Sequence, residues 1–571
     1  MSQILFGVNN MANITGKKSI FFVTSPRSPL KMQDEIKLLV DKLTGRIWNT
    51  DSQTEFSKLL SSSDFFEGKI LSNLDFAARD RVNRAPKALG LVDLQPVVKI
   101  TDAGNLFVNG KRPKEILSRQ LFKFQLPSPY HTDNENTFNI RPYLELLRLI
   151  YELDGLNKNE IAMFVMQLTN IDRYEDVRSQ MLNFREKVSS IDRNFTNYRR
   201  TADEIFNNIV SKLYKEEIRQ GNIETRESDE NSLEHFISTK KSNFKDYADA
   251  AIRYLRATEL VAIKKGTYKI FVPEEKMAEV KFILDNTERK ALKFNSIVDF
   301  KAYLFEPTFP ALITDNKQKL IVEILKVDRQ SNRSQLERLS LEELKDAREA
   351  LAAASLEKNI SEQVTELKTY EKYDEILETY LDIEEDRTIE PSLIMEWNTW
   401  RAFVMLDDGD IKANLRFDDL GMPLDTAPGN RPDILCNYED FGLTVEVTLS
   451  SGQRQYEMEG ESVARHLGRQ KSQAKKDTFC IFVAEFLNSA TLAHFYALNR
   501  IPVSYYGGKA KIIPFSLSDF KLFLKQAYVS HTKPSSNTIK NFLTRISDSA
   551  ESVEDENEWY ANISSLVNSW V

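Results

Sequence analysis

Two acidic residues in the C-terminal third of the sequence have a spacing that could bring them face to face. Asp433 follows a proline, and Glu446 lies in a Val-Glu-Val-Thr run. If their segments join through a tight turn near Glu439-Asp440, the two acids oppose one another on one sheet face, with Cβ atoms about 4.5–5.5 Å apart. Carboxylates that close repel one another unless a cation or a proton lies between them. Mg²⁺ prefers oxygen ligands, so we expect Asp433 and Glu446, with the Val447 carbonyl, to hold it. Phosphodiester hydrolysis is the chemistry that such a site supports.

Three further side chains could assist this pair. Glu396 lies on an expected helix upstream of it. Glu459 and His466 follow the pair and are seven residues apart, close to two helical turns, so they project from one helix face. Taken singly, Glu459 is typical of a solvated surface acid, and His466 is typical of a packing or capping histidine. Their position directly after the two acids favours a role beside them.

The segments around these residues predict a mixed α/β domain. Strands alternate with helices there, which indicates helices that cover a sheet. The expected elements are a helix over 393–403, β-structure over 431–449, a helix over 457–471, a strand over 478–484, a helix over 489–498, a strand pair over 502–506 and 510–514, and a final helix near 519–526.

The N-terminal half has a winged-helix outline. A strand is expected over 19–24, and a helix over 32–43. A helix from Leu74 ends at Leu89-Gly90, and two short β-like runs follow, 97–100 and 106–108. Helix, glycine stop and small hairpin together are typical of a winged helix.

A second copy of this outline follows downstream. Helices are expected over 141–154, 158–168 and 247–260, and the last leads into a hairpin of 261–264 and 267–272 around Lys265-Gly266. Ordinary α+β packing is the alternative explanation for both copies. Residues 334–386 contain neither glycine nor proline, so they predict helices, either a spacer between domains or a solvated helical pair.

Composition limits the class of protein. A chain of 571 residues is too long for one core, and two to four domains are expected. Two cysteines argue against a disulfide framework or a cysteine-based zinc site. No apolar run is long enough for a membrane span, and Met1–Asn13 has no signal pattern, so we expect a cytoplasmic protein.

The net charge of −8 says little about a nucleic-acid partner, because DNA responds to the field within about 8–10 Å. Between Phe76 and Gln125, ten basic residues accompany only four acids, which fits a DNA-binding patch. The ten are Arg79, Arg81, Arg84, Lys87, Lys99, Lys111, Arg112, Lys114, Arg119 and Lys123. Arg79, Arg81, Arg84 and Lys87 lie on one expected helix and are the candidate DNA-binding residues, although a solvated basic helix face explains them as well.

Long strings of residues give the sequence a family resemblance. They are Phe21–Pro29 (FFVTSPRSP), Arg79–Gly90 (RDRVNRAPKALG), Gln120–Tyr130 (QLFKFQLPSPY) and the surroundings of Asp433 and Glu446. With these the chain resembles the AlwI family of type IIS restriction endonucleases, in which PleI and MlyI and some strand-nicking enzymes are grouped.

The resemblance implies a PD-(D/E)xK nuclease fold at the C-terminus. Asp433 and Glu446 then match the metal-binding acids, and Glu396, Glu459 and His466 match accessory catalytic positions. Many nucleases of this superfamily have a lysine two residues after the second acid, where this chain has Thr448. Threonine carries no charge, so His466, helped by Glu459, could orient or deprotonate the water instead. The alternative is that metal-bound water alone suffices.

The expected protein is therefore a multidomain α+β nuclease. Its parts are two winged-helix-like recognition subdomains (1–140 and 141–300), a helical linker (301–390) and a PD-(D/E)xK α/β cleavage domain (391–571). It would bind a short asymmetric site in double-stranded DNA and cut outside it with Mg²⁺, using a transient homodimer or a small second subunit for the second strand. Two alternatives are a strand-specific nicking enzyme, or large subunit of a heterodimeric enzyme, and a winged-helix DNA-binding regulator without catalysis.

Overall fold

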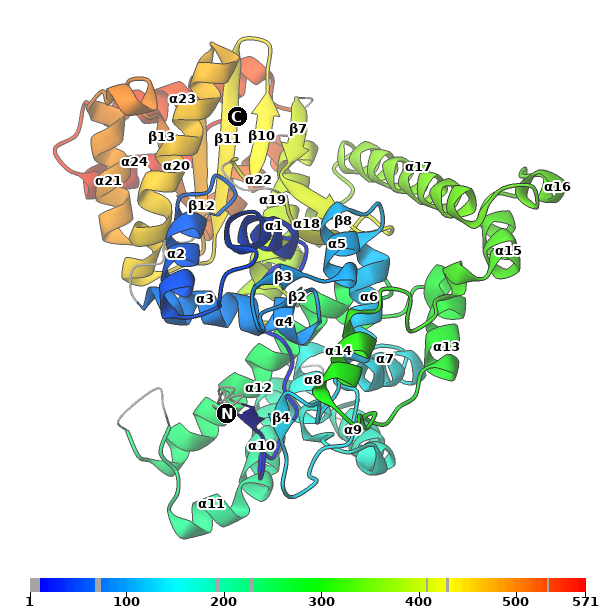
Figure 1. Cartoon of the computed structure of the whole chain (residues 1–571). Coiled ribbons are helices and arrows are strands. Elements are labelled where there is room, and N and C mark those ends of the chain that lie inside the picture. Colours follow the sequence, from blue (N-terminus) through cyan, green and yellow to red (C-terminus); the bar gives the residue numbers. More distant parts are fainter. Residues whose placement is uncertain are drawn as a thin grey trace. The chain divides into compact units, whose positions relative to one another are not determined.

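Helices account for 59% of the chain in the computed structural model, so this is a mostly helical α+β protein. The structure describes residues 11–66, 73–189, 195–225, 230–406, 409–427, 431–530 and 533–571. The chain divides into two compact units (Figure 1). The N-terminal unit comprises Met1–Ser63 and Gly68–Arg348, and the C-terminal unit comprises Asp64–Glu67 and Glu349–Val571.

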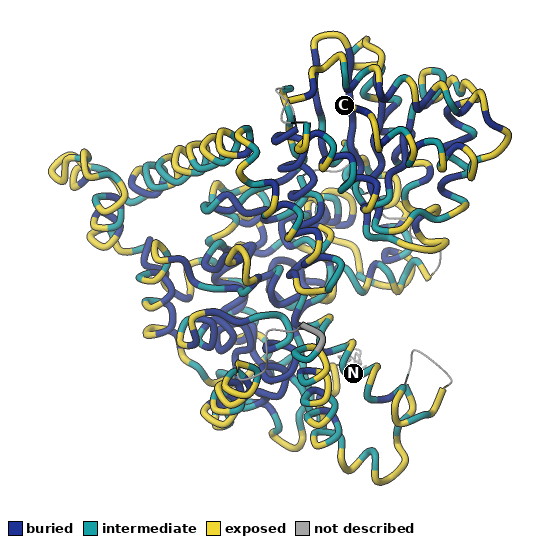
Figure 2. Tube along the Cα trace, turned by 180° about the vertical axis from the view of Figure 1, so that it is seen from behind, coloured by how far each residue is buried: buried dark blue, intermediate teal, exposed yellow. Residues whose placement is uncertain are grey.

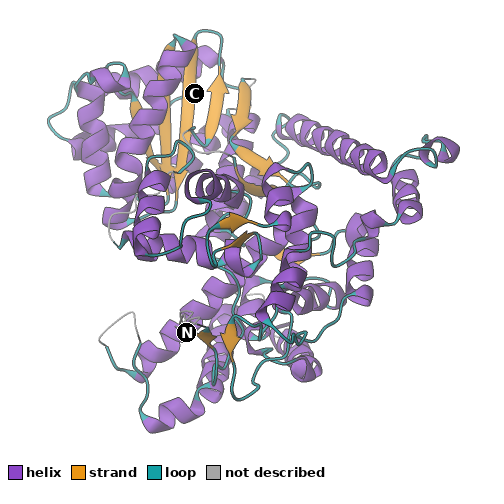
Figure 3. Ribbon diagram, in the orientation of Figure 1, coloured by secondary structure: helices purple, strands orange, loops and turns teal. Residues whose placement is uncertain are grey.

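The N-terminal unit consists mainly of helices with short strand pairs between them (Figure 3). Its helices are α1 (Met32–Leu43), α2 (Thr50–Ser61), α3 (Leu74–Asn83), α4 (Ala85–Ala88), α5 (Asp102–Asn109), α6 (Pro113–Lys123), α7 (Pro142–Glu152), α8 (Lys158–Met163), η1 (Val165–Gln167), η2 (Ile171–Arg173), α9 (Tyr174–Ser189), α10 (Phe195–Leu213), α11 (Lys215–Gln220), α12 (Leu233–Arg256), η3 (Glu274–Lys276), α13 (Met277–Asn286), α14 (Ile297–Phe305), η4 (Ile313–Asp315), α15 (Lys317–Val327) and α16 (Arg333–Leu336). Its strands are β1 (Ala12–Asn13), β2 (Val92–Asp93), β3 (Lys99–Ile100), β4 (His131–Thr132), β5 (Ala262–Lys264) and β6 (Lys269–Phe271). The division between the units falls within α17 (Leu341–Leu367).

The first predicted wing is wrong. Residues 106–108 belong to α5, and β3 pairs antiparallel with β2 instead. The hydroxyl of Thr101 accepts a hydrogen bond from the Gly104 amide, so Thr101 is the N-cap of α5 and starts a helix where a turn was expected. Gly104 also lets α5 approach the chain, because a Cβ there would lie 1.8 Å from the Leu91 carbonyl oxygen. The short apolar run is therefore helical, and its β-like residues misled the prediction.

The other expectations for the N-terminal half have mixed outcomes. The helix over 32–43 and the hairpin around Gly266 are confirmed. The strand over 19–24 is wrong, because these residues form no strand; the Ile20 amide donates to the Met166 carbonyl, and Ile20 and Phe22 are buried. The predicted helical stretch over 334–386 is confirmed as α16, α17 and α18 (Tyr373–Glu384).

The C-terminal unit has a five-stranded mixed sheet. The order of its strands is β13 (Ile512–Ser516), β12 (Asp477–Ala484), β11 (Phe441–Thr448), β10 (Ile434–Asn437) and β7 (Asp410–Ala413). Strands β11, β12 and β13 are parallel, and β10 is antiparallel to both β11 and β7. Helices α20 and α21 pack on one face of the sheet, and α19 and α22 pack on the other. In chain order, the elements of this unit after α18 are α19 (Pro391–Leu406), β7 (Asp410–Ala413), the hairpin of β8 (Leu415–Phe417) and β9 (Pro423–Thr426), β10 (Ile434–Asn437), β11 (Phe441–Thr448), α20 (Gly452–Ala474), β12 (Asp477–Ala484), α21 (Ser489–Arg500), η5 (Ser504–Tyr506), β13 (Ile512–Ser516), α22 (Leu517–Val529), α23 (Ser536–Ser549) and α24 (Glu556–Val567).

Burial differs between the two halves of this sheet. The central strands β11 and β12 are buried on both faces, as expected for β12 from its continuous apolar run, and they form part of the dark blue core in Figure 2. Strands β10 and β7 alternate between more and less buried positions. One face of the sheet is therefore less covered at β10 and β7 than in the centre.

Two expectations for this unit need correction. Residues 504–506 form the short helix η5 in place of a strand, and α22 is followed by α23 and α24. Both cysteines, Cys436 on β10 and Cys480 on β12, are buried, and they form no disulfide with each other. None of the helices that the structure describes is both long enough and apolar enough to cross a membrane.

Candidate active site

The hairpin of β10 and β11 brings Asp433 and Glu446 together. Ile434 pairs with Val445, so Asp433, directly before β10, lies opposite Glu446 on β11. The expected hairpin and its register are therefore confirmed. The Val447 amide donates a hydrogen bond of 2.8 Å to Asp433 Oδ2, and the Asn414 amide donates one of 2.7 Å to the Asp433 carbonyl. Neighbouring strands thus fix the backbone and the carboxylate of Asp433.

His466 joins this pair from α20. Its Nδ1 lies 2.8 Å from Glu446 Oε1, and both side chains are buried. Helix α20 packs on β11 and β12, which places His466 over Glu446. Glu459 lies half-buried on the same helix, and Glu396 lies half-buried on α19, which also packs against β11. Asp433, Glu446 and His466 therefore lie together, and the catalytic roles of these three residues, like those of Glu459 and Glu396, stay predictions.

The position two residues after Glu446 supplies no positive charge. Thr448 is buried, and its hydroxyl accepts a hydrogen bond of 3.0 Å from the Ser450 amide, which shapes the turn into α20. On β12, burial raises the pKa of the Cys480 thiol well above its usual value, and the charges of Glu446 and Asp433 raise it further. This thiol therefore stays protonated beside the two acids.

The donor set fits Mg²⁺ in its usual, partly hydrated form. Among the residues that the structure describes, no group of three or more His, Cys, Asp or Glu side chains is arranged to hold a metal. Mg²⁺ needs no such cage, because it is commonly held by one or two carboxylates and keeps several waters. Asp433 and Glu446 supply two carboxylates from adjacent strands. Val447 stays a predicted third ligand.

A cleft of about 710 Å³ lies next to these acids. It is lined by Lys412, Ala413, Asn414, Arg431, Pro432, Leu435, His466, Arg469, Gln470 and Gln473. The sequence interpretation missed its basic members. For Arg469 the signal was its position three residues after His466, which places both on one side of α20.

The one helix expected to carry the four predicted DNA-binding residues is two helices: Arg79 and Arg81 lie on α3, Arg84 lies between α3 and α4, and Lys87 lies on α4. Several of the four have partners within the protein. Arg79 pairs with Asp75, and Arg84 pairs with Asp80. Arg81 donates to both oxygens of the buried Glu35. The ammonium of Lys87 lies 4.8 Å from the centre of the Tyr130 ring, and burial lowers its pKa. The side chains of Arg79 and Arg84 are nearly half exposed, and their role in DNA binding stays a prediction.

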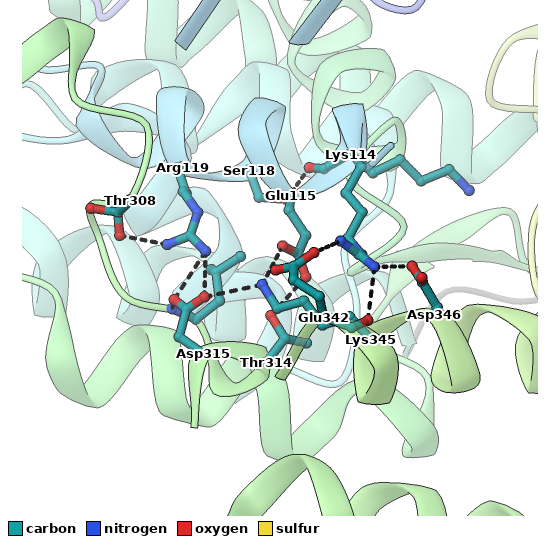
Figure 4. Close-up of polar contacts among 12 residues, drawn as sticks. Lys114, Glu115, Ser118, Arg119, Thr308, Thr314, Asp315, Glu342, Lys345 and Asp346 are labelled. Carbon is teal, nitrogen blue, oxygen red and sulfur yellow. Dashed lines mark hydrogen bonds and ion pairs between the residues drawn. The ribbon is translucent and has the colours of Figure 1, made fainter. Parts of the chain in front are cut away.

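The wider basic stretch meets acids from distant parts of the sequence, around α6 and the start of α17 (Figure 4). Arg119 binds both carboxylate oxygens of Asp315, at 2.8 and 2.9 Å. Lys345 lies between Glu115 and Asp315. Arg112 pairs with Glu342 and Asp346. The local excess of positive charge is thus largely compensated inside the N-terminal unit.

Comparison with known proteins assigns first the class and then the family. The chain is a restriction endonuclease, an enzyme that cleaves DNA, which excludes the alternative of a regulator without catalysis. The family model described as AlwI restriction endonuclease matches residues 87–523, well over half of the chain, so the protein belongs to the AlwI restriction endonuclease family.

Two solved structures are also similar to the chain, at low TM-scores. The small subunit of the heterodimeric restriction endonuclease R.BspD6I is 27% identical with a TM-score of 0.29, over 33% of this chain and 97% of that subunit. The BpuJ1 endonuclease binding domain, in complex with pyrene- and phenanthrene-modified DNA, is 13% identical with a TM-score of 0.32, over 50% of this chain and 95% of that domain. No curated protein matches the chain.

Proposed function

We propose that the protein is a type IIS endonuclease that binds a short asymmetric site in double-stranded DNA in the cytoplasm and hydrolyses a phosphodiester at a fixed distance outside it. The observation that supports this most is the hairpin that opposes Asp433 and Glu446, with His466 on the second acid. The family membership supplies the substrate, since restriction endonucleases cleave DNA. The C-terminal part (391–571) is then a PD-(D/E)xK cleavage domain, residues 1–300 bind and read the DNA, and residues 301–390 link the two.

Each residue of the candidate site has its own proposed role in hydrolysis. Asp433 and Glu446 would hold Mg²⁺, which when bound supplies positive charge to the phosphate and lowers the pKa of water. Val447 holds the Asp433 carboxylate through its amide, so that acid keeps one orientation. His466 holds Glu446 in the same way and, helped by Glu459, replaces the lysine that Thr448 does not provide. A water molecule attacks the phosphorus and gives up a proton, the bond from phosphorus to the 3′ oxygen breaks, that oxygen takes up a proton, and the product carries a 5′-phosphate.

A second candidate function is strand-specific nicking. One Asp433–Glu446 pair hydrolyses one phosphodiester at a time, so it cuts one strand each time the protein binds DNA. Cleavage of both strands then requires a transient homodimer or a small second subunit. Relaxed circles that accumulate without linear product would favour nicking, and linear product formed at a rate that rises with protein concentration would favour a homodimer.

Run-off sequencing of digested plasmid tests the main proposal. With Mg²⁺ we expect breaks at one fixed distance from a common short sequence, and with EDTA an intact plasmid. Breaks spread without a common neighbouring sequence, or undiminished cleavage in EDTA, would contradict the type IIS and Mg²⁺ assignments respectively.

A further inference from the structure

Strand register aligns the candidate active site with an open part of the sheet. Asn414, Asp433 and Glu446 lie side by side on successive strands, because Ile434 pairs with both Ala413 and Val445. Two residues further along β10, Leu435 lies beside Lys412 and points to the same face as Asp433. Helix α20 packs over β11 and β12, whereas β10 and β7 are less covered on this face. The cleft of about 710 Å³ lies over this uncovered part, and we call it the β7–β10 trough.

The β7–β10 trough is positively charged. Its lining contains Lys412, Arg431 and Arg469 and no aspartate or glutamate. Arg431 stands two residues before Asp433 in the chain, and Arg469 follows His466 by one turn of α20. Both arginines are exposed, and within the described ranges of the chain neither forms an ion pair. In the N-terminal unit, by contrast, most arginines of the basic stretch are paired with acids.

A nuclease that holds DNA beside two carboxylates needs such cations. The phosphates on either side of the scissile one also carry negative charge, and the two acids repel them. Thr448 offers no compensation, since it is uncharged and its hydroxyl is engaged with Ser450. Arginine suits this position, because its planar guanidinium donates two parallel hydrogen bonds to a phosphate and is always charged.

We propose that the β7–β10 trough seats the sugar–phosphate backbone of the strand that is cut, and that Arg431 and Arg469 each contact a phosphate next to the scissile phosphodiester. This inference depends on the proposed function. The two arginines are positioning residues that hold the strand in register with Asp433 and Glu446. Lys412 also lines the trough, but its charge is paired with that of Asp410, so the two arginines supply the free positive charge.

Single-turnover cleavage by Arg431→Ala, Arg469→Ala and the double variant of the full chain tests this assignment. We expect each single variant to cleave about tenfold more slowly at physiological salt and the double variant more slowly still. The slope of log affinity for DNA against log salt should fall by about 0.9 for each phosphate that the variant no longer binds. Cleavage should recover toward the wild-type rate at low salt. The matched control is Arg545→Ala, an exposed arginine on α23, which packs against β13.

DNA with single uncharged phosphate analogues can show whether each arginine contacts a phosphate directly. In each duplex, one methylphosphonate replaces one phosphate near the cut. If Arg431 contacts a given phosphate, its neutralisation slows the wild-type enzyme and has little further effect on Arg431→Ala, because both changes remove one interaction. The same test at a different phosphate applies to Arg469.

Two results would overturn the inference. If the Arg431 and Arg469 variants match Arg545→Ala in cleavage rate and salt slope, the trough does not hold the strand. The proposed function still stands in that case, because the wild-type protein cleaves DNA. A wild-type protein that never cleaves DNA with Mg²⁺ would refute the proposed function and the trough assignment together.

Discussion

Replacing Asp433 by asparagine separates the two physical roles of this residue. Its carboxylate accepts a hydrogen bond from the Val447 amide and lies opposite the Glu446 carboxylate. Asparagine can still accept that hydrogen bond through its side-chain oxygen, but it carries no charge. We therefore expect Asp433→Asn to fold, to bind DNA and to lose cleavage by at least about a thousandfold, because only one acid remains for the cation.

The stability change follows from two opposing contributions. Two carboxylates about 5 Å apart repel by roughly 3 kcal/mol at an effective dielectric constant near 20. The hydrogen bond to Val447 weakens by about 1 kcal/mol when its acceptor loses its charge. Without Mg²⁺ the variant should therefore be more stable than the wild type by about 1–2 kcal/mol. For a unit of this size that corresponds to a melting midpoint roughly 2–8 °C higher.

Tryptophan fluorescence is a suitable assay, because four of the five tryptophans (Trp397, Trp400, Trp559 and Trp570) lie in the C-terminal unit. Mg²⁺ should raise the melting midpoint of the wild type, since binding to the folded state stabilises it, and should raise that of Asp433→Asn much less. Asp440→Asn, an exposed acid in the turn of the same hairpin, serves as the matched control. Wild-type cleavage by Asp433→Asn, or a lower melting midpoint without Mg²⁺, would refute the reasoning.

Three further substitutions test other parts of the structure. His466→Ala removes the partner of Glu446, so a partial loss of cleavage of about 10–100-fold with normal gel-shift binding is expected; an unchanged rate would leave this histidine a packing role only. Gly104→Ala places a Cβ 1.8 Å from the Leu91 carbonyl oxygen. The unfolding free energy of the N-terminal unit, measured by urea titration, should therefore fall by about 1–3 kcal/mol or more. An unchanged urea midpoint would contradict this close approach. Lys123→Met removes a buried ammonium that donates to three carbonyls at the end of α14. The unfolding free energy of the N-terminal unit in urea should therefore fall by about 2–4 kcal/mol. An unchanged unfolding free energy would mean that these carbonyls find other donors.

The hairpin that holds the two acids could be predicted because its determinants are local. Two β-type segments separated by a short turn leave one register that keeps their apolar residues on the buried side. That register sets Asp433 against Glu446. Helical spacing likewise placed Glu459 and His466 on one helix, although only the structure gives the contact between His466 and Glu446.

The remaining features depend on contacts between distant residues. Arg81 meets Glu35, and Arg112 meets Glu342, so a basic stretch in the sequence is not a free basic surface in the folded unit. The β7–β10 trough exists because α20 lies over some strands and leaves others open, which no local pattern encodes. The mistaken wing had a local cause, since the β-like residues of α5 concealed the capping signal of Thr101.

The two buried cysteines can report how often the helices that cover the C-terminal sheet separate from its strands. Cys436 and Cys480 point to opposite faces of the sheet, because Cys436 pairs with Leu443 whereas Cys480 pairs with the next residue, Thr444. A thiol reagent reacts with the exposed thiolate, so neither sulfur can be alkylated until its covering helices separate from the strands. The rate of alkylation therefore measures how often each layer of helices lifts away, and mass spectrometry of the two labelled peptides distinguishes the layer of α20 from that of α19. A single cysteine introduced at the surface could carry a probe with little background from these two.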